Sequence, residues 1–109
     1  LFVCDDVNLT FGKLRLRDSG SSGGHHGLES VITALGSEDF ARLRVGVGSE
    51  SMPKDDLTDY VLGKFSSEEE KALEGILEKA AAVCESWSQG GIQDALKCLS
   101  KVQSSAKGE

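Results

Sequence analysis

Apolar and polar residues alternate in two short segments of the chain, KLRLR at 13–17 and FARLRVGVG at 40–48. An alternation with a period of two is typical of a half-buried β-strand, because successive side chains point to opposite faces. The apolar positions are Leu14, Leu16, Leu43, Val45 and Val47, and arginines occupy positions 15, 17, 42 and 44 between them. The pattern therefore predicts two strands, each with a basic outer face.

A third strand is expected at the start of the chain, where the apolar run LFVC leads into two acidic residues. This pattern predicts a buried strand that ends at Asp5 or Asp6. The following segment NLTFG is expected to form a turn, and DSGSSGG at 18–24 is expected to form a loop.

Helical spacing follows the loop. Leu28, Val31, Ile32 and Leu35 recur at intervals of three and four, and Gly36 is suited to end the helix. The polar segment 49–56 contains the chain's one proline and is expected to be a surface loop, and 57–65 is expected to form one or two helical turns.

A longer helix is predicted from Ser66 or Ser67, where a serine followed by glutamates is typical of a capping box. Its expected buried stripe is Leu73, Ile76, Leu77, Ala80, Cys84 and Trp87. Gly90 and Gly91 are expected to stop it, and Ile92, Ala95, Leu96 and Leu99 predict a last short helix before a polar tail at 101–109.

This order of elements predicts an α/β protein, and 109 residues suffice for one small domain. Three short strands are few for a whole α/β domain. Because the chain also opens in a strand and begins with Leu1, we expect it to be a piece of a longer protein. The sequence has no apolar run of membrane-spanning length, and we expect no signal peptide, because LFVCDDV has neither a basic start nor an apolar core of the required length. The net charge of −6 argues against indiscriminate nucleic-acid binding. The three cysteines, Cys4, Cys84 and Cys98, have no metal-ligand spacing and are expected to be buried, reduced thiols.

The glycine-rich segment that ends in His25 and His26 carries the most informative chemistry, and four interpretations are open. It could be a remnant of a purification tag, a metal site, a flexible connection in which one histidine caps the helix, or a substrate-binding loop. In the last case the glycines would let backbone N–H groups approach a ligand at the helix start.

Two other features favour a substrate loop. Asp5 and Asp6 are expected at the edge of the sheet where α/β proteins bind ligands. The arginines at 15, 17, 42 and 44 form two matched basic stripes, and guanidinium groups on neighbouring strands are suited to bind a phosphate.

Together, VCDDVNLTFGKLRLR, SGGHHGLESVI, FARLRVGVG and DYVLGKF resemble the C-terminal half of the bacterial-type peptidyl-tRNA hydrolases, in order and with the expected spacing. The resemblance implies a single α/β globule around a twisted mixed sheet with flanking helices. Residues 1–109 would be the C-terminal part of that one domain. It also implies hydrolysis of the ester between a peptide and tRNA, with no metal or other cofactor.

The resemblance implies roles for individual residues. Asp5 matches the aspartate that orients the family's catalytic histidine, a general base for water. His25 matches a histidine of the substrate cleft, and His26 stands where the family usually has an asparagine. Arg17 and Arg44 match the two basic residues that bind the 5′-phosphate of the tRNA acceptor stem. Arg15 and Arg42 match no named role.

The family's catalytic histidine lies before the position that matches Leu1, so neither His25 nor His26 is expected to be the base. We expect the chain alone to be inactive and to need the missing N-terminal half, a second copy or another partner. The alternatives are an RNA- or protein-binding module on the same fold, as in a plant organellar splicing cofactor, and an inactive fragment. The expected location is the cytoplasm, with an organelle as the alternative, and no membrane partner is expected.

Overall fold

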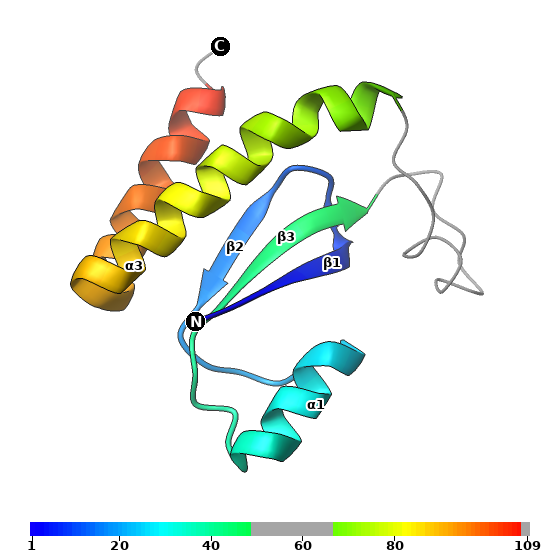
Figure 1. Ribbon diagram of the computed structural model, residues 1–109, viewed down its shortest axis with the longest axis vertical. Helices are drawn as coiled ribbons and strands as arrows, with labels where there is room; N and C mark the ends of the chain where they lie inside the picture. Colours follow the sequence, from blue (N-terminus) through cyan, green and yellow to red (C-terminus); the bar gives the residue numbers. More distant parts are fainter. Residues whose placement is uncertain (49–66, 108–109) are drawn as a thin grey trace.

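The computed structural model describes residues 1–48 and 67–107. Its elements, in chain order, are β1 (Phe2–Thr10), β2 (Leu14–Arg17), α1 (His26–Leu35), β3 (Arg42–Gly48) and α3 (Ser67–Lys107). Figure 1 shows the sheet between the two helices, with α3 along one side of it and α1 on the other. The fold is therefore mixed α/β, as predicted.

The described strands form one mixed sheet in the order β1-β3-β2. β3 is parallel to β1 and antiparallel to β2. The turn at Phe11–Gly12 joins β1 directly to β2, yet the two strands are kept apart because β3 lies between them. The third strand in the sequence is therefore the centre of the sheet.

Two glycines of β3 let the end of β1 come close. A Cβ added at Gly46 would collide with the carbonyl oxygens of Leu9 and Thr10, and one at Gly48 would collide with that of Val7. The pairing of β1 with β3 is also irregular between Asp6 and Thr10. The absence of a side chain at these two positions is what allows the backbones to approach there.

β1 differs from its prediction in two respects. It continues past Asp5 and Asp6 to Thr10, so the segment expected to begin a turn is still strand. It also lies at an edge of the sheet, and the side chains of Phe2 and Val3 are 39% and 52% exposed. The prediction of a buried strand ending at the acidic pair is therefore wrong, because pairing with β3 overrides the local polar signal.

The core lies between the sheet and α3. Its fully buried members are Leu14, Leu16, Leu43, Ala80, Val83, Ala95 and Leu99. The apolar faces predicted for β2 and β3 are thus confirmed. Leu77 was expected on the buried stripe but is 54% exposed, and Val83, which the predicted stripe omitted, is fully buried.

α3 is two helices joined at a kink. Gly91 has φ 77° and ψ −163°, which interrupts the helix at the glycine pair expected to stop it. The second helix continues to Lys107, well into the segment expected to be a polar tail. No glycine or proline occurs between Ile92 and Lys107, so nothing in the backbone chemistry ends the helix earlier.

The expected loop at 49–56, the helical turns at 57–65 and the N-cap candidate Ser66 lie outside the described residues. Ser67 is the first residue of α3. Within the described part of the chain, no helix combines the length and the apolar character that a membrane span requires.

Candidate functional site

All four arginines of the chain lie on two adjacent strands. Arg15 of β2 is directly opposite Arg44 of β3, and Arg17 is directly opposite Arg42. Opposite residues of an antiparallel pair share a face, so the two basic stripes predicted from the sequence meet on one side of the sheet. The leucines between them point to α3 on the other side.

A surface hollow of about 400 Å³ opens over this basic face. Its walls come from β1, β2, β3 and the glycine-rich loop, and its lining residues are Asp6, Asn8, Arg15, Arg17, Ser19, Gly20, Ser21, Gly23, Arg42 and Arg44. Arg17 and Arg44, the two residues expected to bind one phosphate, therefore line the same hollow.

The four guanidinium groups are not equally available. Arg15 and Arg17 are exposed. Arg17 donates to the neighbouring carbonyl of Leu16 at 2.9 Å, and Arg15 has no hydrogen-bond partner within the described residues. An anion that enters the hollow can therefore bind these two side chains while displacing few existing hydrogen bonds.

Arg42 is buried, with only 1% of its surface exposed, which corrects the expectation of an outward basic residue. Its guanidinium donates, within the described residues, only to backbone carbonyls: Gly20 at 2.6 Å, Ser21 at 3.1 Å, Glu38 at 2.8 Å and Phe40 at 3.2 Å. The loops on either side of α1 fold over this face of β3 and enclose the side chain. Arg42 is therefore already saturated by the protein itself.

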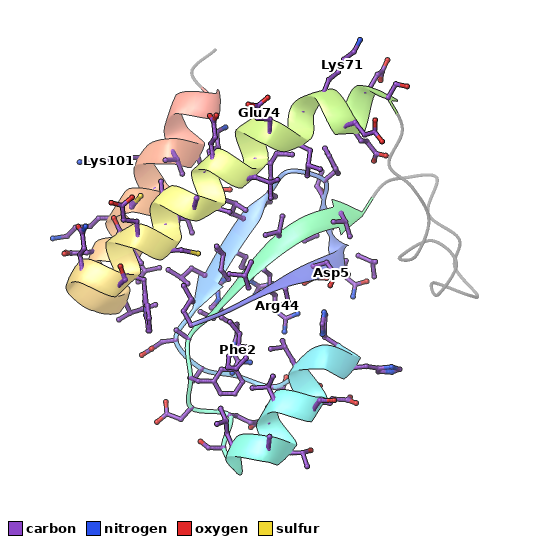
Figure 2. The ribbon with its side chains drawn as sticks, viewed as in Figure 1. Phe2, Asp5, Arg44, Lys71, Glu74 and Lys101 are labelled. Atoms are coloured by element: carbon purple, nitrogen blue, oxygen red, sulfur yellow. The ribbon has the colours of Figure 1, made fainter. Side chains whose placement is uncertain are left out.

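Arg44 is shared between an acid and the glycine-rich loop. Its Nη1 lies 3.3 Å from Oδ2 of Asp6, and both side chains are 12% exposed. Its Nη2 donates to the carbonyls of Ser22 at 3.1 Å and Ser21 at 3.5 Å. Figure 2 shows Arg44 and Asp5 on neighbouring strands near α1. Arg44 thus lines the hollow, and the carboxylate of Asp6 compensates part of its positive charge.

The glycine-rich loop makes a tight turn before α1. Gly23 and Gly24 have φ of 59° and 83°, values that favour glycine. The turn is closed by the backbone N–H of His25, which donates to the carbonyl of Ser22 at 3.1 Å, and by Ser22 Oγ, which accepts from the N–H of Gly24. These contacts direct the next side chain, His25, toward β1.

His25 is the N-cap of α1. The backbone N–H of Leu28 donates to Nδ1 of His25 at 3.1 Å, and Nε2 of the same ring lies 3.1 Å from Oδ1 of Asp5. Because Nδ1 accepts, the ring proton of neutral His25 belongs on Nε2, which then donates to the Asp5 carboxylate. The structure thus matches the capping interpretation, and adds a contact with the acid that the sequence singled out.

The two adjacent histidines have different surroundings. The His25 side chain is 22% exposed and both of its ring nitrogens are engaged, whereas the Asp5 side chain is 44% exposed. His26 is the first residue of α1 and is exposed. Contact of either ring with a substrate stays a prediction. Among the described residues, no group of His, Cys, Asp and Glu has the arrangement that a metal ion requires.

Cys4 lies on β1 next to the two acids. Burial raises the pKa of its thiol above the ordinary value, the nearby guanidinium of Arg44 lowers it, and the carboxylates of Asp5 and Asp6 raise it. The net effect keeps the thiol protonated at neutral pH. All three cysteines are free and are half-buried, so they are less enclosed than predicted.

Sequence reasoning missed two roles at this site. It placed Asp6 at a strand end, but did not pair it with Arg44, and it left Arg42 without a role. The alternation at 40–48 puts both arginines on the face opposite the leucines, but the carbonyls that saturate Arg42 come from loops that the strand pattern does not place.

A family model described as peptidyl-tRNA hydrolase matches residues 1–107. A peptidyl-tRNA hydrolase of Chlorobium limicola is 45% identical over 101 residues, which are 93% of this chain and 53% of that protein. One of Lachnoclostridium phytofermentans is 42% identical over 102 residues, covering 93% of this chain and 52% of the relative.

Comparison with solved structures leads to the same family. The crystal structure of the Acinetobacter baumannii peptidyl-tRNA hydrolase superimposes with a TM-score of 0.76 at 29% identity, covering 89% of this chain and 48% of that one. The chain therefore spans about half the length of the relatives that it matches.

Proposed function

The chain belongs to the peptidyl-tRNA hydrolase family, and from this premise we propose that it supplies one wall of an active site that hydrolyses the ester between peptide and tRNA. The observation that carries the proposal is the position of the Asp5 carboxylate on β1. The carboxylate is held by His25, and Asp5 stands next in the chain to Asp6, which lines the arginine-rich hollow. A group suited to orient a catalytic base and one residue of a site suited to a phosphate thus occupy consecutive positions of β1.

The proposed role of Asp5 is to orient and stabilise the histidine that acts as general base. His25 contacts Oδ1, and the Asp5 side chain is 44% exposed, which supports a role for Oδ2 in binding a second imidazole. A carboxylate in this position selects the tautomer of the base and stabilises the imidazolium that forms when water is deprotonated.

The proposed phosphate site uses Arg17 and Arg44. Both line the hollow, and Arg17 is exposed and nearly unengaged. A phosphate near Arg44 would compete with Asp6 and would gain charge-assisted hydrogen bonds from both guanidinium groups. Such a site would hold the 5′-phosphate of the acceptor stem and so position the ester.

His25 and His26 are proposed to lie beside the bound acceptor end. His25 supports the proposal through its place between Asp5 and the start of α1, where backbone N–H groups favour negative charge. His26 is exposed at that same helix start and can donate one hydrogen bond where the resemblance places an amide.

We further propose that the working enzyme contains polypeptide beyond these 109 residues, and that it acts in the cytoplasm. Among the described strands β1 has no partner on its outer edge, and Phe2 and Val3 are exposed there, which supports this proposal, since strand edges in native proteins are usually covered or paired. The additional part would bring the general base to Asp5.

The test is single-turnover cleavage of a labelled peptidyl-tRNA by two proteins. One is the 109-residue chain, and the other is the same chain joined to the N-terminal portion of the Chlorobium limicola relative. We expect cleavage by the joined protein and none by the chain alone. If the isolated chain cleaves the ester, His25 or His26 is the base and the assignment of roles is wrong. If the joined protein folds and binds tRNA without cleaving it, the chain is an RNA-binding module instead.

A further inference from the structure

α1 has little apolar attachment to the rest of the molecule. Leu28 is its one fully buried side chain, Val31 and Ile32 are half-buried, and Leu35 is 57% exposed. Burial of one leucine is a modest contribution for placing a ten-residue helix. Other contacts must therefore determine where the helix starts and which way His25 faces.

One side chain, that of Arg42, makes polar contacts with the loops at both ends of α1. The guanidinium of Arg42 donates to Gly20 and Ser21 in the loop that enters the helix, and to Glu38 and Phe40 in the loop that leaves it. The two loops also meet directly, because the N–H of Gly20 donates to the carbonyl of Glu38 at 3.3 Å. The Phe40 ring lies under the guanidinium, 4.3 Å from its Cζ atom.

We infer that Arg42 is a positioning residue, which clamps the two loops that flank α1 and thereby sets the His25 ring against Asp5. The meaning of that histidine–carboxylate pair for catalysis rests on the proposed function, whereas the clamp itself rests on the contacts alone. Arg42 is 1% exposed and its guanidinium is engaged by the carbonyls of the two loops, so it acts through His25.

The chemistry of the guanidinium explains why arginine occupies this position. Its five N–H groups form a planar fork, and here Nε, Nη1 and Nη2 all donate, which lets one side chain serve two separate loops. A lysine keeps the charge but presents its three donors from a single point, so it cannot reach both loops. Arg42→Lys is therefore the informative substitution, because it preserves charge and removes only the geometry.

The experiment is NMR on the 109-residue chain, comparing the parent, Arg42→Lys and the control Lys97→Met, which removes an exposed cation from α3. Ring ¹⁵N shifts report which nitrogen of His25 carries the proton, and hydrogen exchange reports the protection of α1. In the parent and the control we expect a single Nε2–H tautomer. In Arg42→Lys we expect averaged tautomers and at least tenfold faster exchange in α1, while α3 changes by less than threefold.

An unchanged His25 tautomer and unchanged α1 protection in a folded Arg42→Lys protein would overturn the inference. If that variant does not fold, side-chain hydrogen exchange in the parent protein provides the test. Its Arg42 Nε–H should exchange at least tenfold more slowly than those of Arg15 and Arg17, and equal rates would overturn the clamp. None of these readouts involves catalysis, so failure of the proposed function would leave them unaffected.

Discussion

Nε2 of His25 lies 3.1 Å from Oδ1 of Asp5, across twenty positions of sequence, while Nδ1 of the same ring caps α1. A single side chain thus ties the first turn of the helix to the first strand of the sheet. Any change that moves the helix start also moves the partner of the carboxylate, which couples local stability to the candidate site.

The cap makes a testable contribution to stability. In His25→Ala the N–H of Leu28 loses its acceptor, and we expect the free energy of unfolding to fall by about 0.5–2 kcal/mol. His25→Asn keeps a side chain suited to an N-cap and should be more stable than the alanine variant. Urea unfolding followed by circular dichroism measures both, and equal stabilities of the two variants would show that the cap contributes nothing.

Two glycines with different surroundings, Gly46 of β3 and Gly75 of α3, predict opposite effects of substitution by alanine. A methyl group at Gly46 would meet the Leu9 and Thr10 carbonyls, so Gly46→Ala should destabilise the chain by about 1–3 kcal/mol through overpacking. Gly75 is exposed in α3 and has open space around it, so Gly75→Ala should stabilise by about 0.5–1 kcal/mol. Thermal unfolding separates these outcomes. A Gly46→Ala protein as stable as the parent would contradict the described strand contact.

The raised pKa of Cys4 predicts slow thiol chemistry. Because burial favours the neutral thiol, the folded state holds this proton more tightly than the unfolded state does. The associated stability is complete below the unfolded pKa and is lost as pH rises through the folded pKa. At pH 8 we expect iodoacetamide to modify Cys4 more slowly in the folded chain than in urea, as measured by peptide mass spectrometry. Equal rates in the two conditions would contradict the raised pKa.

Local pattern was sufficient for much of this fold. The leucine–arginine alternation predicted the two faces of β2 and β3, and Gly36 ends α1 in the left-handed conformation with its N–H bonded to the Ile32 carbonyl. These features depend on neighbours in sequence, so periodicity and cap chemistry capture them. The acidic pair Asp5 and Asp6 did not end β1, because the strand's length depends on a distant partner.

Local pattern was also insufficient to predict how the arginines of the candidate site are engaged. Arg42 and Arg44 have the same place in the strand alternation. The guanidinium of Arg42 is nevertheless saturated by loop carbonyls, whereas that of Arg44 pairs with Asp6 and lines the hollow. Nothing in the pattern of β3 distinguishes them, since the difference comes from the loops on either side of α1 and from Asp6, which that pattern does not place. The histidine cap was one of several open alternatives, and the hydrogen bond from the Leu28 N–H to Nδ1 of His25 is what favours it.

Because Asp6 compensates part of the charge of Arg44, changes of charge in the lining of the hollow should change its affinity for a 5′-phosphate. Asp6→Asn keeps the acceptor for the N–H of Asn8 but removes the negative charge beside Arg44, so we expect it to bind an RNA hairpin with a 5′-phosphate more tightly. Asn8→Asp adds a negative charge to the same lining and should weaken binding. Fluorescence anisotropy at several salt concentrations measures both effects. Shifts in the same direction would contradict a phosphate site in the hollow.

Arg17 supplies the matching test of specificity. Arg17→Ala should weaken binding of the phosphorylated hairpin by about 1–3 kcal/mol, the scale of a charged hydrogen bond, and should hardly affect the same hairpin without its phosphate. Arg44→Ala should behave similarly, with a smaller loss because Asp6 already engages that guanidinium. Equal losses on both hairpins would count against a phosphate clamp.

The most direct test of the account is the single-turnover rate of peptidyl-tRNA cleavage by the joined protein carrying Asp5→Asn. Asparagine keeps the size and an acceptor for His25 but cannot stabilise an imidazolium, so we expect the rate to fall by about 100-fold or more. Asp39→Asn, which neutralises an exposed acid in the loop after α1, should leave the rate unchanged. A rate for Asp5→Asn equal to that of the control would contradict the central claim that this carboxylate orients the catalytic base.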